Sequence, residues 1–123
     1  MEFKALVADS STKTRKNITR SLNEIGVRDV VEATDGQNAF ELVKNGKFDV
    51  IFTEWNTKNN AGESLIDAVR KINQKTPVIV TAPSKKLEDL KKSCPTATNY
   101  LTMPFTTEQL KKTVQQYVPS IAG

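Results

Sequence analysis

Short apolar runs alternate with longer segments of helical periodicity along this chain, and this alternation restricts the fold more than any other feature. Each run is continuous, as expected of strands that are buried on both faces of a sheet. The runs cover residues 5–8, 30–31, 50–52, 78–80 and 100–101. Between and after them, apolar residues recur every three or four positions, which predicts amphipathic helices. The sequence therefore predicts a doubly wound α/β fold, a five-stranded parallel sheet with five helices.

Several residues mark where the helices and strands are expected to begin and end. In three places a hydroxyl or amide residue precedes Glu or Gln by three positions, which is the spacing of a capping box. These pairs are Thr34 with Gln37, Asn60 with Glu63, and Thr106 with Gln109. Gly26 and Gly46 are expected to end the first two helices. Pro77 is expected to open the fourth strand, since a missing N–H costs least there.

The composition fits one globular domain that spans residues 1–123. Hydrophobic residues make up 37% of the chain and charged residues 26%. No apolar run approaches the roughly 20 residues that a membrane helix needs, and the first residues lack the pattern of a signal peptide. The one cysteine, Cys94, is compatible with a reducing compartment. We therefore expect a cytoplasmic protein without a membrane partner.

Charge and the absence of histidine limit the classes of function. The chain has no histidine, which excludes a Ser-His triad, a His metal site and a phosphohistidine carrier. The 18 Lys and Arg residues exceed the 14 Asp and Glu residues, for a net charge of +4. Nucleic acid and acidic protein surfaces are both open as partners of a basic chain. The simpler interpretation of the net charge is that the protein is basic but binds neither kind of partner.

Polar and chemically distinctive residues follow the predicted strands. In doubly wound sheets, ligands bind at the carboxyl ends of the strands, near the switch in strand order. The residues at these ends are Asp9 and Ser10, Glu54 to Asn56, Thr81, and Met103. We expect them to share one edge of the sheet.

These strand ends, taken in order, resemble the receiver domain of response regulators, in particular the chemotaxis regulators. The resemblance runs from about Lys4 to Val118. It is carried by residues 6–9, 32–36, 55–56 with Gly62, 80–82, and Tyr100 with residues 104–105. It implies the strand order 2-1-3-4-5. It also implies a role in two-component, or phosphorelay, signal transduction.

Three positions depart from the pattern that the resemblance implies. In such a domain, an aspartate after the third strand accepts a phosphoryl group from a histidine kinase, whereas this chain has Glu54. A pair of acids after the first strand holds magnesium, whereas only Asp9 remains and Ser10 takes the second place. A lysine precedes the proline after the fifth strand, whereas this chain has Met103. The resemblance assigns Thr81 as the switch hydroxyl and Tyr100 as the switch aromatic.

The departures have consequences for metal binding and charge. Asp9, Glu54 and the backbone carbonyl of Asn56 could offer oxygen ligands to magnesium. Because Glu is one methylene longer than Asp, we expect the magnesium site to be weak or lost, and no cofactor to be needed. With Met103 in place of lysine, no cation is expected in the cluster, and the two carboxylates are expected to raise each other's pKa. Glu54 either imitates the phosphorylated state or remains as a polar residue in a pocket that has lost its role.

A lysine-rich face is the expected site of partner binding. The lysines are Lys85, Lys86, Lys91 and Lys92 on the fourth helix, and Lys111 and Lys112 on the fifth. The resemblance implies that partners and dimer mates dock on this surface, which includes Tyr100. An acidic face on a signalling protein would suit it, although lysine-rich helices are also often simply solvated. We expect a monomer or a weak dimer.

The sequence therefore predicts an atypical pseudo-receiver that acts by binding a protein and accepts no phosphoryl group. We expect no enzymatic activity, because no nucleophile has a base beside it. One alternative is a receiver that is phosphorylated elsewhere, at Asp9 or at a hydroxyl of the first turn. Another is a basic module that binds nucleic acid or another anion, although few aromatic residues and no recognition helix support it.

Overall fold

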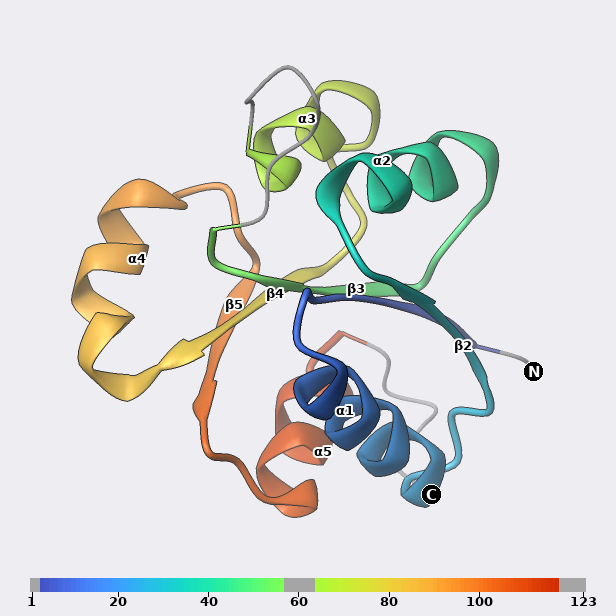
Figure 1. Cartoon of the computed structure of the whole chain (residues 1–123), viewed down its shortest axis with the longest axis vertical. Helices are drawn as coiled ribbons and strands as arrows, with labels where there is room; N and C mark the ends of the chain where they lie inside the picture. Colours follow the sequence, from blue (N-terminus) through green and yellow to red (C-terminus); the bar gives the residue numbers. More distant parts are fainter. Residues whose placement is uncertain (1–2, 57–63, 118–123) are drawn as a thin grey trace.

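A five-stranded parallel sheet forms the centre of the molecule (Figure 1). This computed structural model describes residues 3–56 and 64–117. The strands are β1 (Lys4–Ala8), β2 (Asp29–Ala33), β3 (Val50–Glu54), β4 (Val78–Pro83) and β5 (Asn99–Met103). They lie in the order β2-β1-β3-β4-β5. The predicted α/β class and strand order are confirmed.

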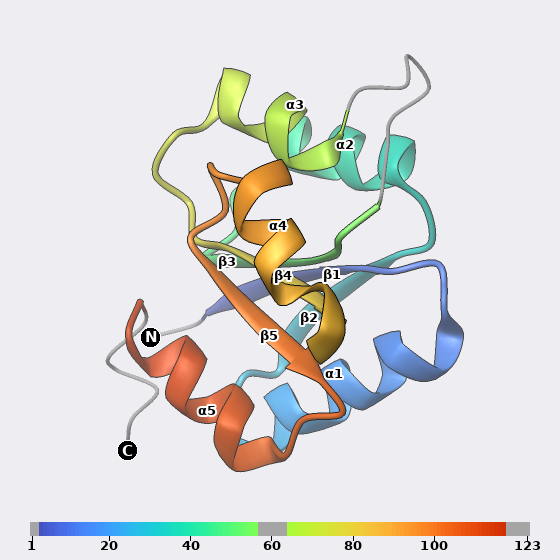
Figure 2. The same ribbon diagram turned by 90° about the vertical axis from the view of Figure 1, so that its left-hand side faces the viewer.

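Helices cover both faces of the sheet. The helices are α1 (Thr12–Glu24), α2 (Gly36–Asn45), α3 (Leu65–Ile72), α4 (Leu87–Ser93) and α5 (Thr107–Gln115). Figure 1 shows α1 and α5 on one side of the sheet and α2 and α3 on the other. Turned by 90°, the molecule presents β5 with α4 and α5 on either side of it (Figure 2).

Two hydrophobic clusters join these layers, because successive strand residues point to opposite faces. Leu6 and Ile51 belong to the cluster beneath α2, α3 and α4, whereas their neighbours Val7 and Phe52 belong to the cluster beneath α1 and α5. All four of these side chains are buried. The strands β1, β3 and β4 are therefore buried on both faces, as their continuous apolar runs predict. The edge strands β2 and β5 are only partly buried, so the same expectation was wrong for them, because an edge strand has a neighbouring strand on one side only.

The helix ends follow the predictions only in part. Thr106 and Gln109 form the predicted capping box at the start of α5. Gly26, just after α1, has a φ of 101°, the left-handed conformation that its position after the helix predicts. The predicted pair of Thr34 and Gln37 is wrong. Asp35 caps α2 instead.

In α2 the Asp35 carboxylate accepts a hydrogen bond from the backbone N–H of Asn38, at 2.7 Å. Carboxylates cap helices at least as well as threonine, which explains the shift by one residue. The helix α3 is capped by Ser64, while the predicted pair of Asn60 and Glu63 lies outside the described residues. Gly46 follows α2 as predicted.

The lysines predicted on the fourth helix divide between two elements. Lys91 and Lys92 lie in α4, whereas Lys85 and Lys86 lie in a short 3-10 turn, η1 (Ser84–Lys86). No side chain caps the start of α4, and a 3-10 turn often precedes an α-helix. Assigning all four lysines to the helix was therefore wrong. Lys111 and Lys112 lie in α5 as predicted.

None of the helices within residues 3–56 and 64–117 has the length and apolar character needed to span a bilayer.

Candidate functional site

The carboxyl ends of three neighbouring strands bring the predicted site residues to one edge of the sheet. Ala8 of β1 pairs with Thr53 of β3. Asp9, which follows β1, and Glu54, the last residue of β3, therefore lie beside each other. Glu54 in turn pairs with Thr81 of β4. The parallel register thus gathers Asp9, Glu54 and Thr81, as the sequence predicts.

The Glu54 carboxylate is held by the residue that follows Asp9. Its Oε1 accepts a hydrogen bond from the backbone N–H of Ser10 at 2.9 Å, and its Oε2 accepts one from the Ser10 hydroxyl at 3.2 Å. Both carboxylate oxygens therefore have donors from the turn between β1 and α1. The side chain of Glu54 bridges the ends of β3 and β1.

Asp9 is buried, with 4% of its surface exposed. Burial is the main reason that its pKa lies above the usual 3.8, and the negative charge of Glu54 raises the pKa further. The Ser11 N–H, which donates to Asp9 Oδ1 at 2.8 Å, and the Arg15 guanidinium oppose this rise. The predicted upward influence of one carboxylate on the other is thus confirmed for Asp9, although burial contributes more.

Arg15 is a cation beside the carboxylates, so the prediction of a cluster without one was wrong. Its side chain is 9% exposed, and its Nε lies 3.1 Å from Glu32 Oε1. Its Nη1 donates to the backbone carbonyl of Asp9 at 2.8 Å. The sequence contains a signal for the burial of Arg15. Arg15 continues the apolar stripe of Ile18 and Leu22 at helical spacing, a position where a charged residue is buried only with partners.

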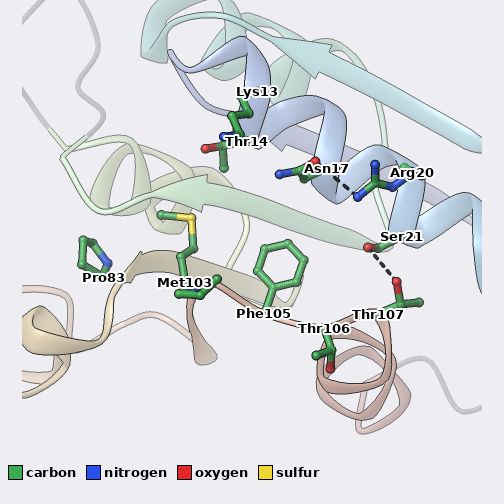
Figure 3. A pocket seen from close by; sticks show the side chains of 11 residues that line it. Lys13, Thr14, Asn17, Arg20, Ser21, Pro83, Met103, Phe105, Thr106 and Thr107 are labelled. Carbon is green, nitrogen blue, oxygen red and sulfur yellow. Dashed lines mark hydrogen bonds between the residues drawn. The ribbon is translucent and has the colours of Figure 1, made fainter.

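Among the other residues predicted at the strand ends, Thr81 lies beside Glu54 in the sheet but makes a separate hydrogen bond. Thr81 is buried, and its hydroxyl donates to the Thr53 carbonyl at 3.5 Å. Met103, at the end of β5, pairs with Pro83 and lines a separate pocket against α1 (Figure 3). Asn56 is exposed just beyond β3.

Tyr100 is half-buried on β5, and its hydroxyl donates to the Cys94 carbonyl at 2.7 Å. Burial raises the pKa of the Tyr100 hydroxyl. This contact ties β5 to the end of α4.

Trp55, next to Glu54, connects the cluster to the lysine-rich face. The Trp55 side chain is 38% exposed. The Nζ of Lys86 lies 5.3 Å from the centre of its ring, within the range of a cation–π contact. Trp55 therefore follows the carboxylate site in the chain and contacts the predicted partner surface through Lys86.

The lysine-rich face carries charges of both signs. Figure 2 shows α4 and α5 flanking β5 on the side that faces the viewer. Glu88 and Asp89 on α4 and Glu108 on α5 lie among the lysines, and the Nζ of Lys91 is 3.6 Å from Glu88 Oε1. The six lysines outnumber these acids, so the face keeps a net positive charge.

In the described part of the chain, no three acidic, cysteine or histidine side chains come together as a candidate metal site. Asp9 and Glu54 supply two carboxylates. One oxygen of Asp9 and both oxygens of Glu54 already accept hydrogen bonds from the protein.

The chain is similar to known proteins over most of its length. Residues 5–115 match the response regulator receiver domain. The chain is 28% identical to the chemotaxis protein CheY of Pseudomonas aeruginosa, over 98% of this chain and 100% of that protein. It is 33% identical to a chemotaxis protein CheY homolog of Campylobacter jejuni, over 98% of this chain and 96% of that protein. The solved structure of Vibrio cholerae CheY4 matches with a TM-score of 0.79 at 29% identity, over 95% of this chain and 99% of that one.

Proposed function

The chain belongs to the response regulator receiver domain family, and from that premise we propose that it is an atypical receiver that accepts no phosphoryl group. It acts in two-component signal transduction by binding a signalling protein. It works in the cytoplasm as one domain over residues 1–123, as a monomer or weak dimer, and it catalyses no reaction of its own.

The contact between Glu54 and Ser10 carries this proposal. A carboxylate oxygen attacks phosphorus with a lone pair, and each hydrogen bond that the oxygen accepts makes it a weaker nucleophile. Both oxygens of Glu54 accept hydrogen bonds from Ser10. The lysine that would meet the phosphoryl group is replaced by Met103, whose side chain supplies no charge.

The same contacts support a weak or absent magnesium site. Magnesium needs nearly octahedral oxygen ligands and usually one or two carboxylates. Asp9, Glu54 and the Asn56 carbonyl are the ligands that this chain could offer. Because three of the four carboxylate oxygens already accept hydrogen bonds, magnesium would have to compete with them. The donor set therefore fits magnesium poorly.

The geometry favours a pocket that has lost its role over an imitation of the phosphorylated state. The Thr81 hydroxyl donates to the Thr53 carbonyl, while both carboxylate oxygens of Glu54 accept hydrogen bonds from Ser10. In the described contacts, nothing joins the Glu54 carboxylate to the Thr81 hydroxyl. An imitation would need that carboxylate to engage the switch residue, because only a differential contact can shift the conformation.

The test compares the wild type with a variant that restores the three family residues, Ser10→Asp/Glu54→Asp/Met103→Lys. Both proteins are titrated with magnesium and then with beryllofluoride, while NMR follows the amides of Thr81 and Tyr100. We expect no saturable response from the wild type and a saturable one from the restored variant. A wild-type response that reaches Thr81 would contradict the proposal. Silence of both proteins would show that these three residues are not the cause.

Incubation with acetyl phosphate, followed by mass spectrometry, addresses the main alternative. We expect no adduct of about 80 Da, the mass of one phosphoryl group, on the wild type. An adduct located at Asp9, or at a hydroxyl of the first turn of α1, would establish instead a receiver that is phosphorylated at another residue.

A further inference from the structure

A pocket of about 500 Å³ lies between α1 and the connection from β5 to α5 (Figure 3). Ligand pockets commonly have volumes of about 300–1,000 Å³, so this pocket could hold a small organic molecule. Its lining comes from α1, from the ends of β4 and β5, and from the start of α5. The lining residues include Lys13, Arg20, Thr14, Met103, Phe105 and Pro83.

One wall of this pocket is apolar. Met103 and Phe105 project toward α1, with Pro83 beside them (Figure 3). None of the three side chains carries a charge or a hydrogen-bond donor. Because Met103 stands where the family has a lysine, this wall is uncharged and suits a flat apolar group.

The opposite wall carries positive charge. Lys13 and Arg20 lie along α1 on the side that faces the pocket (Figure 3). Arg20 donates to Asn17 Oδ1 at 3.4 Å, and its Nε lies 3.8 Å from Glu24 Oε1, so Glu24 offsets part of its charge. Among the ion pairs of residues 3–56 and 64–117, none includes Lys13.

We propose that this pocket binds a small aromatic anion, with its ring against Met103 and Phe105 and its phosphate or carboxylate near Lys13 and Arg20. An apolar wall that faces cations selects a molecule with one apolar end and one negative end. Placing an anion near the charged wall strengthens binding without burying an unpaired charge. This inference goes beyond the proposed function and does not rest on it.

The experiment uses two probes with the same ring system, 1-naphthyl phosphate and the uncharged 1-naphthol. Each is titrated into the ¹⁵N-labelled protein, and NMR follows the backbone amides. We expect saturable shifts in α1 and in residues 103–107 for 1-naphthyl phosphate, with a Kd of about 1 mM or tighter. We expect 1-naphthol to bind about tenfold more weakly, since it lacks the charge.

Matched variants separate this pocket from general attraction to lysines. Lys13→Gln/Arg20→Gln should weaken binding of 1-naphthyl phosphate about tenfold, whereas Lys92→Gln/Lys112→Gln, which removes the same charge elsewhere, should leave it unchanged. Thr14→Trp should abolish binding by filling the pocket from α1 without changing its charge. The dispersion of each NMR spectrum shows that the variant is folded.

Four results would overturn the inference. They are shifts centred outside the pocket, titrations that do not saturate, equal binding of the two probes, and an equal loss of affinity in the two charge variants. If Thr14→Trp unfolds the protein, the comparison of the two charge variants still decides the question. Shifts that follow α4 and α5 in place of α1 are a case of the first result and would assign the attraction to the lysine-rich face.

Discussion

Asp9 is held in surroundings that favour its neutral form, and this has a measurable effect on stability. Burial, and then Glu54, keep its pKa above the usual 3.8. When the pKa of a carboxyl group is higher in the folded than in the unfolded protein, the stability that this group contributes is lost as the pH rises through the folded pKa. At neutral pH the charged Asp9 therefore destabilises the fold. We predict that Asp9→Asn raises the melting temperature at pH 7, because the amide oxygen can still accept from the Ser11 N–H.

Thermal unfolding at several pH values checks this prediction. The advantage of Asp9→Asn should shrink as the pH falls toward 3.8, the usual value for an aspartate, since the wild-type carboxyl then becomes neutral as well. A variant that melts at or below the wild-type temperature at neutral pH would be incompatible with the argument.

Tyr100 provides a second test at the scale of a single residue. Its hydroxyl donates to the Cys94 carbonyl at 2.7 Å, so Tyr100→Phe should lower the free energy of unfolding by about 1 kcal/mol. Tyr117→Phe is the matched control, because its hydroxyl lies 3.5 Å from the Thr98 carbonyl in an exposed contact. Urea denaturation measures both. If both variants lose the same free energy of unfolding, the Tyr100 hydrogen bond stabilises the fold no more than the exposed Tyr117 contact does.

At the scale of elements, Arg15 fastens α1 to two strands. One side chain reaches the Asp9 carbonyl at the end of β1 and the Glu32 carboxylate of β2. We predict that Arg15→Met lowers the free energy of unfolding by about 2–3 kcal/mol at pH 7, because the buried Asp9 carbonyl loses its charged donor and Glu32 loses one of its two cations.

Lys16→Met is the control for this prediction, since Lys16 pairs with the same carboxylate at 3.0 Å but is 65% exposed. We expect it to cost less than about 1 kcal/mol. Burial raises the pKa of Glu32, but the hydrogen bonds from Lys16 and Arg15 lower it by more, so that the pKa lies below the usual 4.5. The stability that Glu32 contributes is therefore present above pH 4.5 and is lost as the pH falls through its lowered pKa. Denaturation curves that rank Lys16→Met with Arg15→Met would contradict the assignment.

The elements themselves could be predicted because the central strands β1, β3 and β4 are apolar on both faces. Leu6 and Val7 enter different hydrophobic clusters, and only a strand with helices on both sides buries such neighbours. Helix starts were less predictable, because Thr34 and Asp35 are both good caps and local sequence does not choose between them. The spacing within α1 indicated that Arg15 is buried, but it could not identify the partner, because Glu32 is distant in sequence.

The site was predictable in its position but not in its contacts. A parallel register places the carboxyl-terminal parts of β1, β3 and β4 at one edge, so Asp9, Glu54 and Thr81 lie side by side there as expected. The direction of each side chain depends on packing. Glu54 turns to Ser10, and Met103 faces α1 across a pocket that no sequence pattern announced.

At the scale of the whole molecule, the lysine-rich face spans two layers of the fold, with β5 between its two helices. Lys91 and Lys92 belong to α4, which packs on the same side of the sheet as α2 and α3, whereas Lys111 and Lys112 belong to α5 on the other side (Figures 1 and 2). Nucleic-acid binding needs basic side chains along one continuous track, with stacking aromatics between them. The exposed aromatic of the described chain, Trp55, lies beside Glu54.

We therefore predict that the protein has no saturable affinity for a labelled single-stranded DNA or RNA of about 30 nucleotides at about 150 mM salt. Fluorescence anisotropy measures this binding. A Kd in the micromolar range that weakens steeply with salt would instead favour the basic nucleic-acid module. Lys91→Gln/Lys92→Gln and Lys111→Gln/Lys112→Gln would then show whether one layer or both carry the attraction. Because net charge of +4 attracts polyanions without specificity, weak binding that vanishes at physiological salt is compatible with a surface made for an acidic protein.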